Sequence, residues 1–251
     1  MAERPLLEVE ELRKTFGGVR AVAGIRFTLT RGDIRAVIGP NGAGKTTLFN
    51  LLSGQLACDG GSIRFDGERI DGLPPPRIWR KGISRTFQVP ATFASLTLRE
   101  NLQTALLSRQ EKSRAMFTAA AGLLREPAMA LLDRVGLSAQ ADAICGTLSH
   151  GDLKRLELAL ALAGEPRLLL LDEPTAGMSA EERPTLIDLV GRIVRERGLT
   201  VLFTEHDMDV VFGIASGILV MHQGRILIDG PPAAVRDDPE VQRVYLGGGA
   251  R

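Results

Sequence analysis

Residues 34–52, IRAVIGPNGAGKTTLFNLL, decide the fold of this chain of 251 residues. They open with a short apolar strand, pass through a glycine-rich turn and continue as a helix with apolar residues at 48, 49, 51 and 52. Residues 39–46 fit the pattern G-x-x-x-x-G-K-[ST], with the strand before it and the helix after it that the pattern requires. A glycine turn that arose by chance would lack that context. The stretch therefore predicts a phosphate-binding loop at the edge of an α/β sheet.

The chemistry of this loop suits a nucleoside triphosphate. Its glycines let the backbone curl so that successive N–H groups point at phosphate oxygens, and the following helix adds its positive end. We expect Lys45 to neutralise the β- and γ-phosphates and the Thr46 hydroxyl to ligate Mg²⁺. The predicted nucleotide-binding residues of the loop are Gly39, Pro40, Asn41, Gly42, Ala43, Gly44, Lys45, Thr46 and Thr47.

Residues 168–174, LLLLDEP, end a second apolar strand with two acids. A run of four leucines is typical of a parallel strand that is buried on both faces. It places Asp172 and Glu173 at the carboxyl edge of the sheet, which is also the edge of the phosphate loop. We expect Asp172 to hold Mg²⁺ through water and Glu173 to act as the general base that orients the attacking water. An acidic turn after a core strand is the simpler explanation, but the phosphate loop elsewhere in the chain favours the catalytic one.

Shorter patterns predict the elements around these two motifs. Strands are expected at 6–9, 19–29, 62–66 and 199–204, with turns at Gly17-Gly18 and Gln223-Gly224. A helix capped by residues 179–182 is expected to end near Gly198. The proline-rich residues 73–76 predict a rigid loop that breaks any helix.

The character of the chain changes to helix-rich between about 90 and 147. Thr97 and Glu100 form a capping box at the start of one helix, and another helix is expected over about 128–135, behind Pro127. Core-type strands resume after this region.

We therefore predict one domain over 1–251. Its core covers about 1–89 and 148–251, and a helical subdomain of about 90–147 is inserted into it.

The composition argues against some classes of function. Lys and Arg number 31 against 30 Asp and Glu, which leaves a net charge of +1 and no global basic field for nucleic acid. Cys58 and Cys145 form no CxxC pair and no metal-ligand cluster, so reduced thiols are expected. No signal-peptide core opens the chain, and the longest apolar stretch, 156–171, is interrupted by charges, glycine and proline. We expect no nucleic-acid partner and no transmembrane segment of the chain's own.

Taken in order, the motifs resemble those of ABC-type ATPase subunits. The resemblance covers about residues 6–246 and rests on GPNGAGKTT at 39–47, Gln88 in RTFQ, LSHGD at 148–152, LLLLDEP at 168–174 and His206 in TEHD. It implies a P-loop NTPase fold with an ABC-type α/β core, an N-terminal antiparallel β portion and an inserted helical subdomain. It also implies ATP and Mg²⁺ as ligands and ATP hydrolysis as the activity.

The same resemblance implies roles for three residues outside the two motifs. Phe16 would stack on adenine, and His206 would contact the γ-phosphate. Gln88 would contact both Mg²⁺ and the attacking water, and would link the core to the helical subdomain. The expected catalytic residues are then Glu173, His206 and Gln88, and the expected metal-binding residues are Thr46, Gln88 and Asp172.

The LSHGD motif opens a helix, with Ser149 at its start and Asp152 three residues on, as in a capping box. A helix N-terminus that carries a serine hydroxyl is also an anion site. In ABC-type ATPases this motif binds the γ-phosphate of ATP held by the opposite subunit, so the resemblance implies that Ser149 and Gly151 contact ATP across a dimer interface. The usual form is LSGGQ, and the roles of His150 and Asp152, which depart from it, stay open.

Softer features look like the ATPase subunits for branched-chain amino acid uptake, of the LivG type, and like related amide and urea importers. They are FGGVRAV at 16–22, DEPTAGMS at 172–179 and the tail DPEVQRVYLGG at 238–248. None of these stretches contacts a solute, so they identify a lineage and not a ligand. The implied partners are integral-membrane permease subunits, a second ATPase subunit that is a copy or a paralogue, and indirectly a solute-binding protein. The implied location is the cytoplasmic face of the inner membrane, as a peripheral protein.

The expected function is ATP hydrolysis that energises uptake of branched-chain or other hydrophobic amino acids, or of amides or urea, through a separate permease. Two alternatives remain. A non-transport ABC-type ATPase acting on DNA or ribosomes usually carries coiled-coil inserts or two cassettes in one chain. A P-loop kinase needs a site for its phosphate acceptor and has no use for the LSHGD helix.

Overall fold

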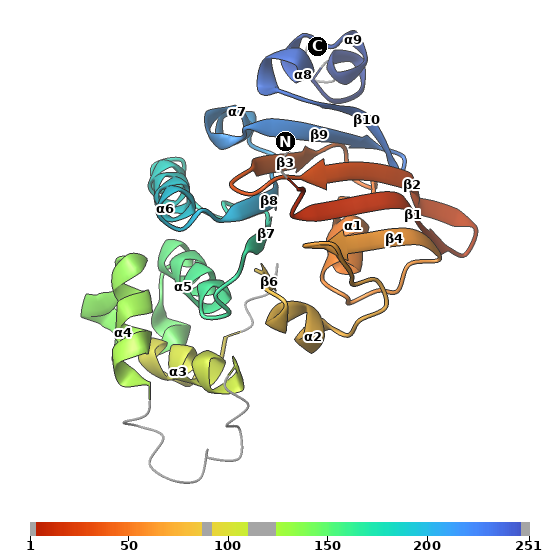
Figure 1. The fold of residues 1–251 in the computed structure, drawn as a ribbon. Coiled ribbons are helices and arrows are strands. Elements are labelled where there is room, and N and C mark those ends of the chain that lie inside the picture. The colour runs from red at the N-terminus through yellow and green to blue at the C-terminus, as the bar shows by residue number, and fades with distance from the viewer. Residues whose placement is uncertain (1–3, 87–91, 110–123, 247–251) are drawn as a thin grey trace.

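The computed structural model describes residues 4–86, 92–109 and 124–246 of the chain. Its centre is a six-stranded sheet (Figure 1) with the strand order β10, β9, β3, β8, β7, β6. In that order the strands are Arg225–Gly230, Gly217–His222, Ile34–Ile38, Thr200–Thr204, Leu168–Asp172 and Ile83–Arg85. All neighbours pair in parallel except β10, which runs antiparallel to β9. The phosphate loop after β3 and the two acids after β7 therefore lie at one edge of the sheet, with β8 between their strands.

A second, antiparallel sheet has the strand order β2, β1, β4, β5. These strands are Val19–Leu29, Leu7–Phe16, Gly60–Phe65 and Glu68–Arg69. The predicted antiparallel β portion is confirmed, as is the turn at Gly17-Gly18, where both glycines have positive φ.

The predicted strand over 6–9 was wrong in its length, because β1 continues to Phe16. The pairing register shifts between Val9 and Leu12 on the β2 side and between Glu10 and Arg13 on the β4 side, and Glu11 lies in the left-handed region with φ 45°. A β-bulge breaks the two-residue alternation that sequence patterns depend on. The bulge also needs a glycine opposite it, since a Cβ on Gly61 would come within 2.5 Å of the Glu10 carbonyl oxygen.

Helices cover the central sheet on both faces. Helix α1 (Lys45–Leu52) shares a buried core with the antiparallel sheet, whereas α5 (His150–Leu162), α6 (Glu182–Arg197) and α7 (Met208–Ile214) belong to the core on the opposite face. Figure 1 shows α5 and α6 on the other side of β7 and β8 from α1. Strand β7 supplies both cores, with Leu168 and Leu170 facing one way and Leu169 and Leu171 the other. This explains its uninterrupted run of leucines.

The region between β6 and α5 contains α3 (Leu98–Arg109) and α4 (Arg125–Arg134), followed by short 3₁₀ turns at Ser138–Gln140 and Cys145–Thr147. The predicted capping box is confirmed: Thr97 Oγ1 accepts from the backbone N–H of Glu100, whose carboxylate accepts from the backbone N–H of Thr97. Helix α4 begins three residues earlier than predicted, because Pro127 lies within its first turn, where proline is tolerated. Both helices pack into the core that contains α5.

The predicted loop over 73–76 was wrong in part. Helix α2 (Pro75–Arg80) begins within it, with Pro75 and Pro76 as its first two residues. Proline is favoured at the start of a helix because its missing N–H has no partner there and its φ is already helical. The same prolines that break a preceding helix therefore start this one.

The remaining predicted elements agree with the structure. Helix α6 ends at Gly198 in the left-handed conformation, and Gln223-Gly224 turn the hairpin of β9 and β10. The chain then forms the short helices α8 (Pro232–Asp237) and α9 (Pro239–Val241). Within the described ranges, no helix combines the length and the apolar character that crossing a membrane requires.

Candidate functional site

The phosphate loop joins β3 to α1 through a backbone that only glycine can adopt at key positions. Gly39 and Gly44 have φ values of 150° and 104°. A Cβ on Gly39 would lie 2.1 Å from the carbonyl oxygen of Met221, and one on Gly44 would lie 2.2 Å from that of Ala21. The loop is therefore pressed against β9 and β2, and its shape depends on the absence of side chains.

Lys45 projects back into this loop from the first turn of α1. Its Nζ donates to the carbonyl oxygens of Gly39 at 2.6 Å and Pro40 at 3.2 Å. Burial lowers the pKa of Lys45, and the negative charges of Glu173 and Asp172 act in the opposite direction. The structure thus brings together the ammonium group and the two acids that the sequence predicted to share a site.

Asp172 is buried at the end of β7 with both carboxylate oxygens engaged. Oδ1 accepts from Thr204 Oγ1 at 2.8 Å, and Oδ2 accepts from Arg85 Nη2 at 2.7 Å. The side chains of Arg85 and Asp172 are 6% and 3% exposed, so their ion pair is almost completely removed from water. Because protein groups already occupy both oxygens, this geometry favours a metal contact through water over direct ligation.

Glu173 adopts a conformation that is uncommon for a residue with a side chain. Its φ is 50°, and its backbone N–H donates to the carbonyl oxygen and Oγ1 of Thr204 on β8. Residues held in this region persist where their surroundings impose it, and they cluster at functional sites. The Glu173 carboxylate, 25% exposed, lies 3.1 Å from His206 Nε2. The predicted general base and the predicted γ-phosphate contact are therefore direct neighbours.

Two buried residues of this site were not predicted from the sequence. Glu205, 4% exposed, accepts from the backbone N–H of Thr175 at 2.9 Å and from that of His206 at 3.0 Å, which joins the segment after β7 to the segment after β8. Arg85 also donates to Asn50 Oδ1 on α1 at 2.6 Å. Glu205 stands in the TEHD motif and Arg85 in the RTFQ motif, which were usable signals, but the partner of Arg85 stands 87 positions away and no local pattern indicates that pairing.

Phe16 lies at the exposed end of β1, beside the Gly17-Gly18 turn. Phe16 is 46% exposed, which is rare for a large apolar residue in the described part of this chain. Lys14 Nζ lies 5.6 Å from the ring centroid. An exposed aromatic ring can stack on a base, and this exposure is compatible with the predicted adenine contact.

The N-terminus of α5 has the predicted serine cap, because Ser149 Oγ accepts from the backbone N–H of Asp152 at 3.1 Å. The Asp152 carboxylate is turned elsewhere, toward Gln140 Nε2 at 3.3 Å and Arg155 Nη1 at 3.9 Å. In a complete capping box the Asp152 carboxylate would accept from the backbone N–H of Ser149. Here it contacts the preceding helical region and α5 instead. Two polar partners moderate the negative charge that Asp152 brings near an anion site.

Gly151 packs against the start of α6, and His150 packs against the segment between β7 and α6. Gly151 is buried, and a Cβ on it would lie 2.8 Å from Glu182 Oε1. The His150 ring lies against Gly177 and lines a cavity of about 110 Å³ together with Asp172 and Glu173.

Among the described hydrogen bonds, none joins Ser149 to the phosphate loop of the same chain. Gln88, the remaining predicted site residue, lies outside the described residues.

The described residues fit ATP and Mg²⁺. A loop backbone that excludes side chains leaves room for phosphates at the start of α1, where Asn41 and Thr46 are exposed. Within the described ranges, no three His, Cys, Asp or Glu side chains gather into a metal cage. Mg²⁺ is usually held by one or two protein groups, with waters and substrate phosphates completing its octahedron. Thr46 and Asp172 are the groups expected to supply such a pair.

Comparisons with known proteins agree with this geometry. Residues 22–176 match the family model described as ABC transporter, and residues 225–251 match the model described as branched-chain amino acid ATP-binding cassette transporter. The chain is 41% identical to the branched-chain amino acid transport ATP-binding protein BraF of Pseudomonas aeruginosa and 38% identical to LivG of Escherichia coli. Each match covers 97% of this chain and 98% of the relative.

Solved structures give the same result for the fold. The chain superposes on the crystal structure of an ATP-binding cassette of an ABC transporter in its ADP conformation with a TM-score of 0.87. The two sequences are 30% identical, and the match covers 97% of this chain and 99% of the other. The chain is similar to these proteins over nearly its whole length.

Proposed function

The chain belongs to the ABC transporter ATPase family, and on that premise we propose that it is the ATP-hydrolysing subunit of an importer for branched-chain amino acids. ATP hydrolysis is general for this family. The observation that carries the proposal is the near full-length similarity to BraF and LivG, together with the match of residues 225–251 to a model specific for branched-chain amino acid transporters. Other hydrophobic amino acids, amides and urea remain candidate solutes, because the sequence features shared with these transporters identify a lineage and not a ligand.

The chemistry follows from the positions of Lys45, Glu173 and His206. The Lys45 ammonium and the first N–H groups of α1 would bind the β- and γ-phosphates, where they stabilise the charge that develops as the terminal phosphoryl group departs. Glu173 would orient the attacking water and accept its proton, and His206, 3.1 Å away, would hold the carboxylate and contact the γ-phosphate. Mg²⁺, when bound, neutralises charge on the phosphate oxygens.

Thr46 and Asp172 are the proposed metal-binding groups, the latter through water. Gln88 is proposed as a third, together with its contact to the attacking water. Phe16 is proposed to stack on adenine.

A second ATPase subunit is proposed to complete the site. Ser149 and the N-terminus of α5 would then bind the γ-phosphate of ATP held by the opposite subunit, which agrees with the lack of a described contact between Ser149 and its own phosphate loop. We propose peripheral association at the cytoplasmic face of the membrane through integral-membrane permease subunits, with a solute-binding protein as an indirect partner.

Reconstitution with the cognate permease and binding protein tests this function. Leucine, isoleucine or valine should stimulate ATP hydrolysis and accumulate inside proteoliposomes, while acetamide and urea should have no effect. Stimulation by an amide or by urea alone would overturn the solute assignment. ATP hydrolysis by the purified subunit without any phosphate acceptor would separate the ATPase from a kinase.

A further inference from the structure

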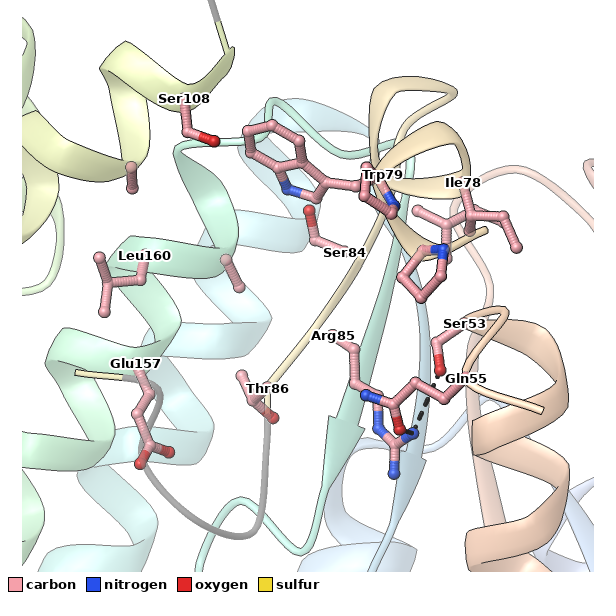
Figure 2. A pocket seen from close by; sticks show the side chains of 15 residues that line it. Ser53, Gln55, Ile78, Trp79, Ser84, Arg85, Thr86, Ser108, Glu157 and Leu160 are labelled. Carbon is pink, nitrogen blue, oxygen red and sulfur yellow. Dashed lines mark hydrogen bonds between the residues drawn. The ribbon is translucent and has the colours of Figure 1, made fainter. Parts of the chain in front are cut away.

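Arg85 is a buried cation whose contacts reach the two elements that carry the proposed metal-binding groups. It is the last residue of β6, and its side chain is 6% exposed. The residue lines a cavity of about 390 Å³, and Figure 2 shows its side chain reaching from β6 toward Ser53 and Gln55. A buried charge must be paired and hydrogen-bonded, because its removal from water is unfavourable. The partners of Arg85 therefore indicate what it holds in place.

The two terminal nitrogens of the Arg85 guanidinium group point to different elements. Nη2 donates to Asp172 Oδ2 on β7 at 2.7 Å. Nη1 donates to Asn50 Oδ1 at 2.6 Å and to Ser53 Oγ at 3.2 Å, at the C-terminal end of α1. The guanidinium carbon also lies 5.6 Å from the centroid of the Phe49 ring on α1. Because the guanidinium group is planar and rigid, one side chain sets the position of the Asp172 carboxylate relative to α1.

The position of Asn50 along α1 brings this contact close to the proposed metal site. Asn50 stands four residues after Thr46, so the two residues share one face of the helix and lie about 6 Å apart along its axis. Thr46 and Asp172 are the groups proposed to bind Mg²⁺. Arg85 thus connects Asp172 to the helix that carries Thr46, one turn away from Thr46 itself.

We propose that Arg85 is a positioning residue for the metal, which holds Asp172 and α1 at the relative position in which Thr46 and Asp172 serve one Mg²⁺ ion. The proposal rests on the ATPase function and the metal-binding groups proposed above. Arg85 itself does not contact the ion, and its effect passes through the orientation of the Asp172 carboxylate. Loss of a group that orients a metal-binding residue typically lowers metal affinity roughly 10- to 100-fold.

A purely structural role for Arg85 predicts a different result. Loss of an ion pair that only stabilises the fold would weaken nucleotide binding equally with and without metal. A positioning role acts only where a metal is bound, and it depends on which metal that is. Mg²⁺ demands near-ideal octahedral geometry, whereas Ca²⁺ accepts a flexible arrangement of its ligands. A displaced Asp172 should therefore weaken the contribution of Mg²⁺ more than that of Ca²⁺.

The test compares Arg85→Lys with the wild type. Lysine keeps a positive charge beside Asp172, but its single ammonium group lacks the rigid fork that holds Asp172 and Asn50 together. Binding of a fluorescent, non-hydrolysable ATP analogue is measured in EDTA, in saturating Mg²⁺ and in saturating Ca²⁺. The metal gain is the ratio of the dissociation constant in EDTA to that with the metal. We expect Arg85→Lys to lower the Mg²⁺ gain about 10-fold and the Ca²⁺ gain less, while affinity in EDTA stays unchanged.

Arg167→Lys is the matched control. Arg167 also pairs with an acid, Asp66, and donates to the carbonyl oxygen of Lys81 on another element. Its guanidinium carbon likewise lies near an aromatic ring, 4.9 Å from the centroid of Phe65. Arg167 stands just before β7, at the opposite end of the strand from Asp172. The same chemical change there should leave both metal gains at their wild-type values.

Asn50→Ala is a second variant, which keeps the test decisive if Arg85→Lys folds poorly. It removes the shortest contact of Arg85 with α1 and leaves the ion pair with Asp172 in place. We expect it to lower the Mg²⁺ gain in the same direction by a smaller factor. A lower gain in Arg85→Lys that Asn50→Ala does not share would show that the ion pair acts alone, and would overturn the proposal.

Two further results would also overturn the role of Arg85. One is an unchanged Mg²⁺ gain in both variants, and the other is an equal loss of affinity with and without metal. These results differ from a failure of the proposed function. If the wild-type protein binds the analogue without any metal gain, the proposed metal site fails together with the role of Arg85. If the wild-type protein does not bind the analogue at all, the proposed ATPase function fails.

Discussion

Glu173 combines strain and chemistry in one residue. Its backbone is held at φ 50° by Thr204, and its carboxylate is held by His206. Such a residue is positioned before the substrate arrives, which lowers the reorganisation needed during the reaction. Its removal should therefore affect hydrolysis far more than binding.

We expect Glu173→Gln to reduce ATP hydrolysis at least about 100-fold, the usual effect of losing a general base, while ATP still binds. The bound nucleotide should hold two subunits together, so size-exclusion chromatography with Mg·ATP should show a dimer. Phosphate release measures the loss of activity, and Glu196→Gln is the matched control. A monomer under these conditions, both alone and with a paralogous subunit, would contradict the shared site.

Arg85 and Asp172 form the most deeply buried ion pair described in the chain. Removing one partner of a buried pair leaves an uncompensated charge, which costs about 3–5 kcal/mol. We expect Arg85→Met to lower the free energy of unfolding by about that amount in urea denaturation. The double variant Arg85→Met with Asp172→Asn should recover a large part of the loss, because no unpaired charge remains. Equal destabilisation of the single and double variants would show that packing, and not charge, holds Arg85 in place.

The residues of the site differ in how far the sequence could reveal them. Lys45, Asp172, Glu173 and His206 stand in local motifs whose position at the ends of parallel strands follows from the pattern. Arg85 acts through a partner 87 positions away, and such a pairing exists only after β6 and β7 have become neighbours. The roles assigned to these residues stay predictions, as do those of Phe16, Gln88, Ser149 and Gly151.

At the scale of elements, the phosphate loop depends on glycine for two separate reasons. One is positive φ, which many glycines of the chain share. The other is the absence of a Cβ, which matters only where other backbone is close. Gly44 and Gly32 separate these reasons, because both have positive φ but only Gly44 has main-chain atoms within reach of a Cβ.

We expect Gly32→Ala to cost about 1 kcal/mol through backbone strain alone and to leave ATP binding unchanged. Gly44→Ala should destabilise the protein further and abolish ATP binding, because its Cβ would lie 2.2 Å from the Ala21 carbonyl oxygen and must displace the loop. Thermal unfolding and a fluorescent ATP analogue measure the two effects. Similar behaviour of the two variants would show that φ alone governs the loop.

Helices and strands whose hydrophobic pattern is regular along the sequence could be predicted. Those whose pattern is interrupted could not. The runs of β7 and β8 and the capped helices α3 and α6 keep their signals, and each agrees with the structure. In β1 the bulge at Glu11 interrupts the alternation of apolar and polar residues from which a strand is predicted. The division of the chain into a core and an inserted helical subdomain stays a prediction, because α3 and α4 share one buried core with α5 and α6, which lie outside the predicted subdomain.

For the whole molecule, the proposed active site is assembled from two subunits. Lys45 of one subunit and Ser149 of the other would bind the same ATP. A Lys45 variant should lose the phosphate contact from the subunit that holds the ATP, and a Ser149 variant should lose the contact from the opposite subunit. Mixing the two variants tests whether the contacts come from different subunits.

We expect Lys45→Ala and Ser149→Ala each to lower ATPase activity at least about 10-fold. Mixing the two should restore activity, because one site of each mixed dimer then combines an intact Lys45 with an intact Ser149. Steady-state ATP hydrolysis of the mixture, compared with each variant at the same total concentration, measures this. Activity no higher than the average of the two variants would indicate that Ser149 acts within its own chain or serves only as a helix cap.

The placement of β8 between β3 and β7 sets the width of the catalytic site. Neighbouring strands lie about 4.8 Å apart, so the strand that leads to the phosphate loop and the strand that carries the acids are separated by roughly 10 Å. That separation leaves a gap between the two motifs, where the proposed cation and its waters would lie between Thr46 and Asp172. The order of three strands thus fixes the separation of the two motifs through the backbone alone.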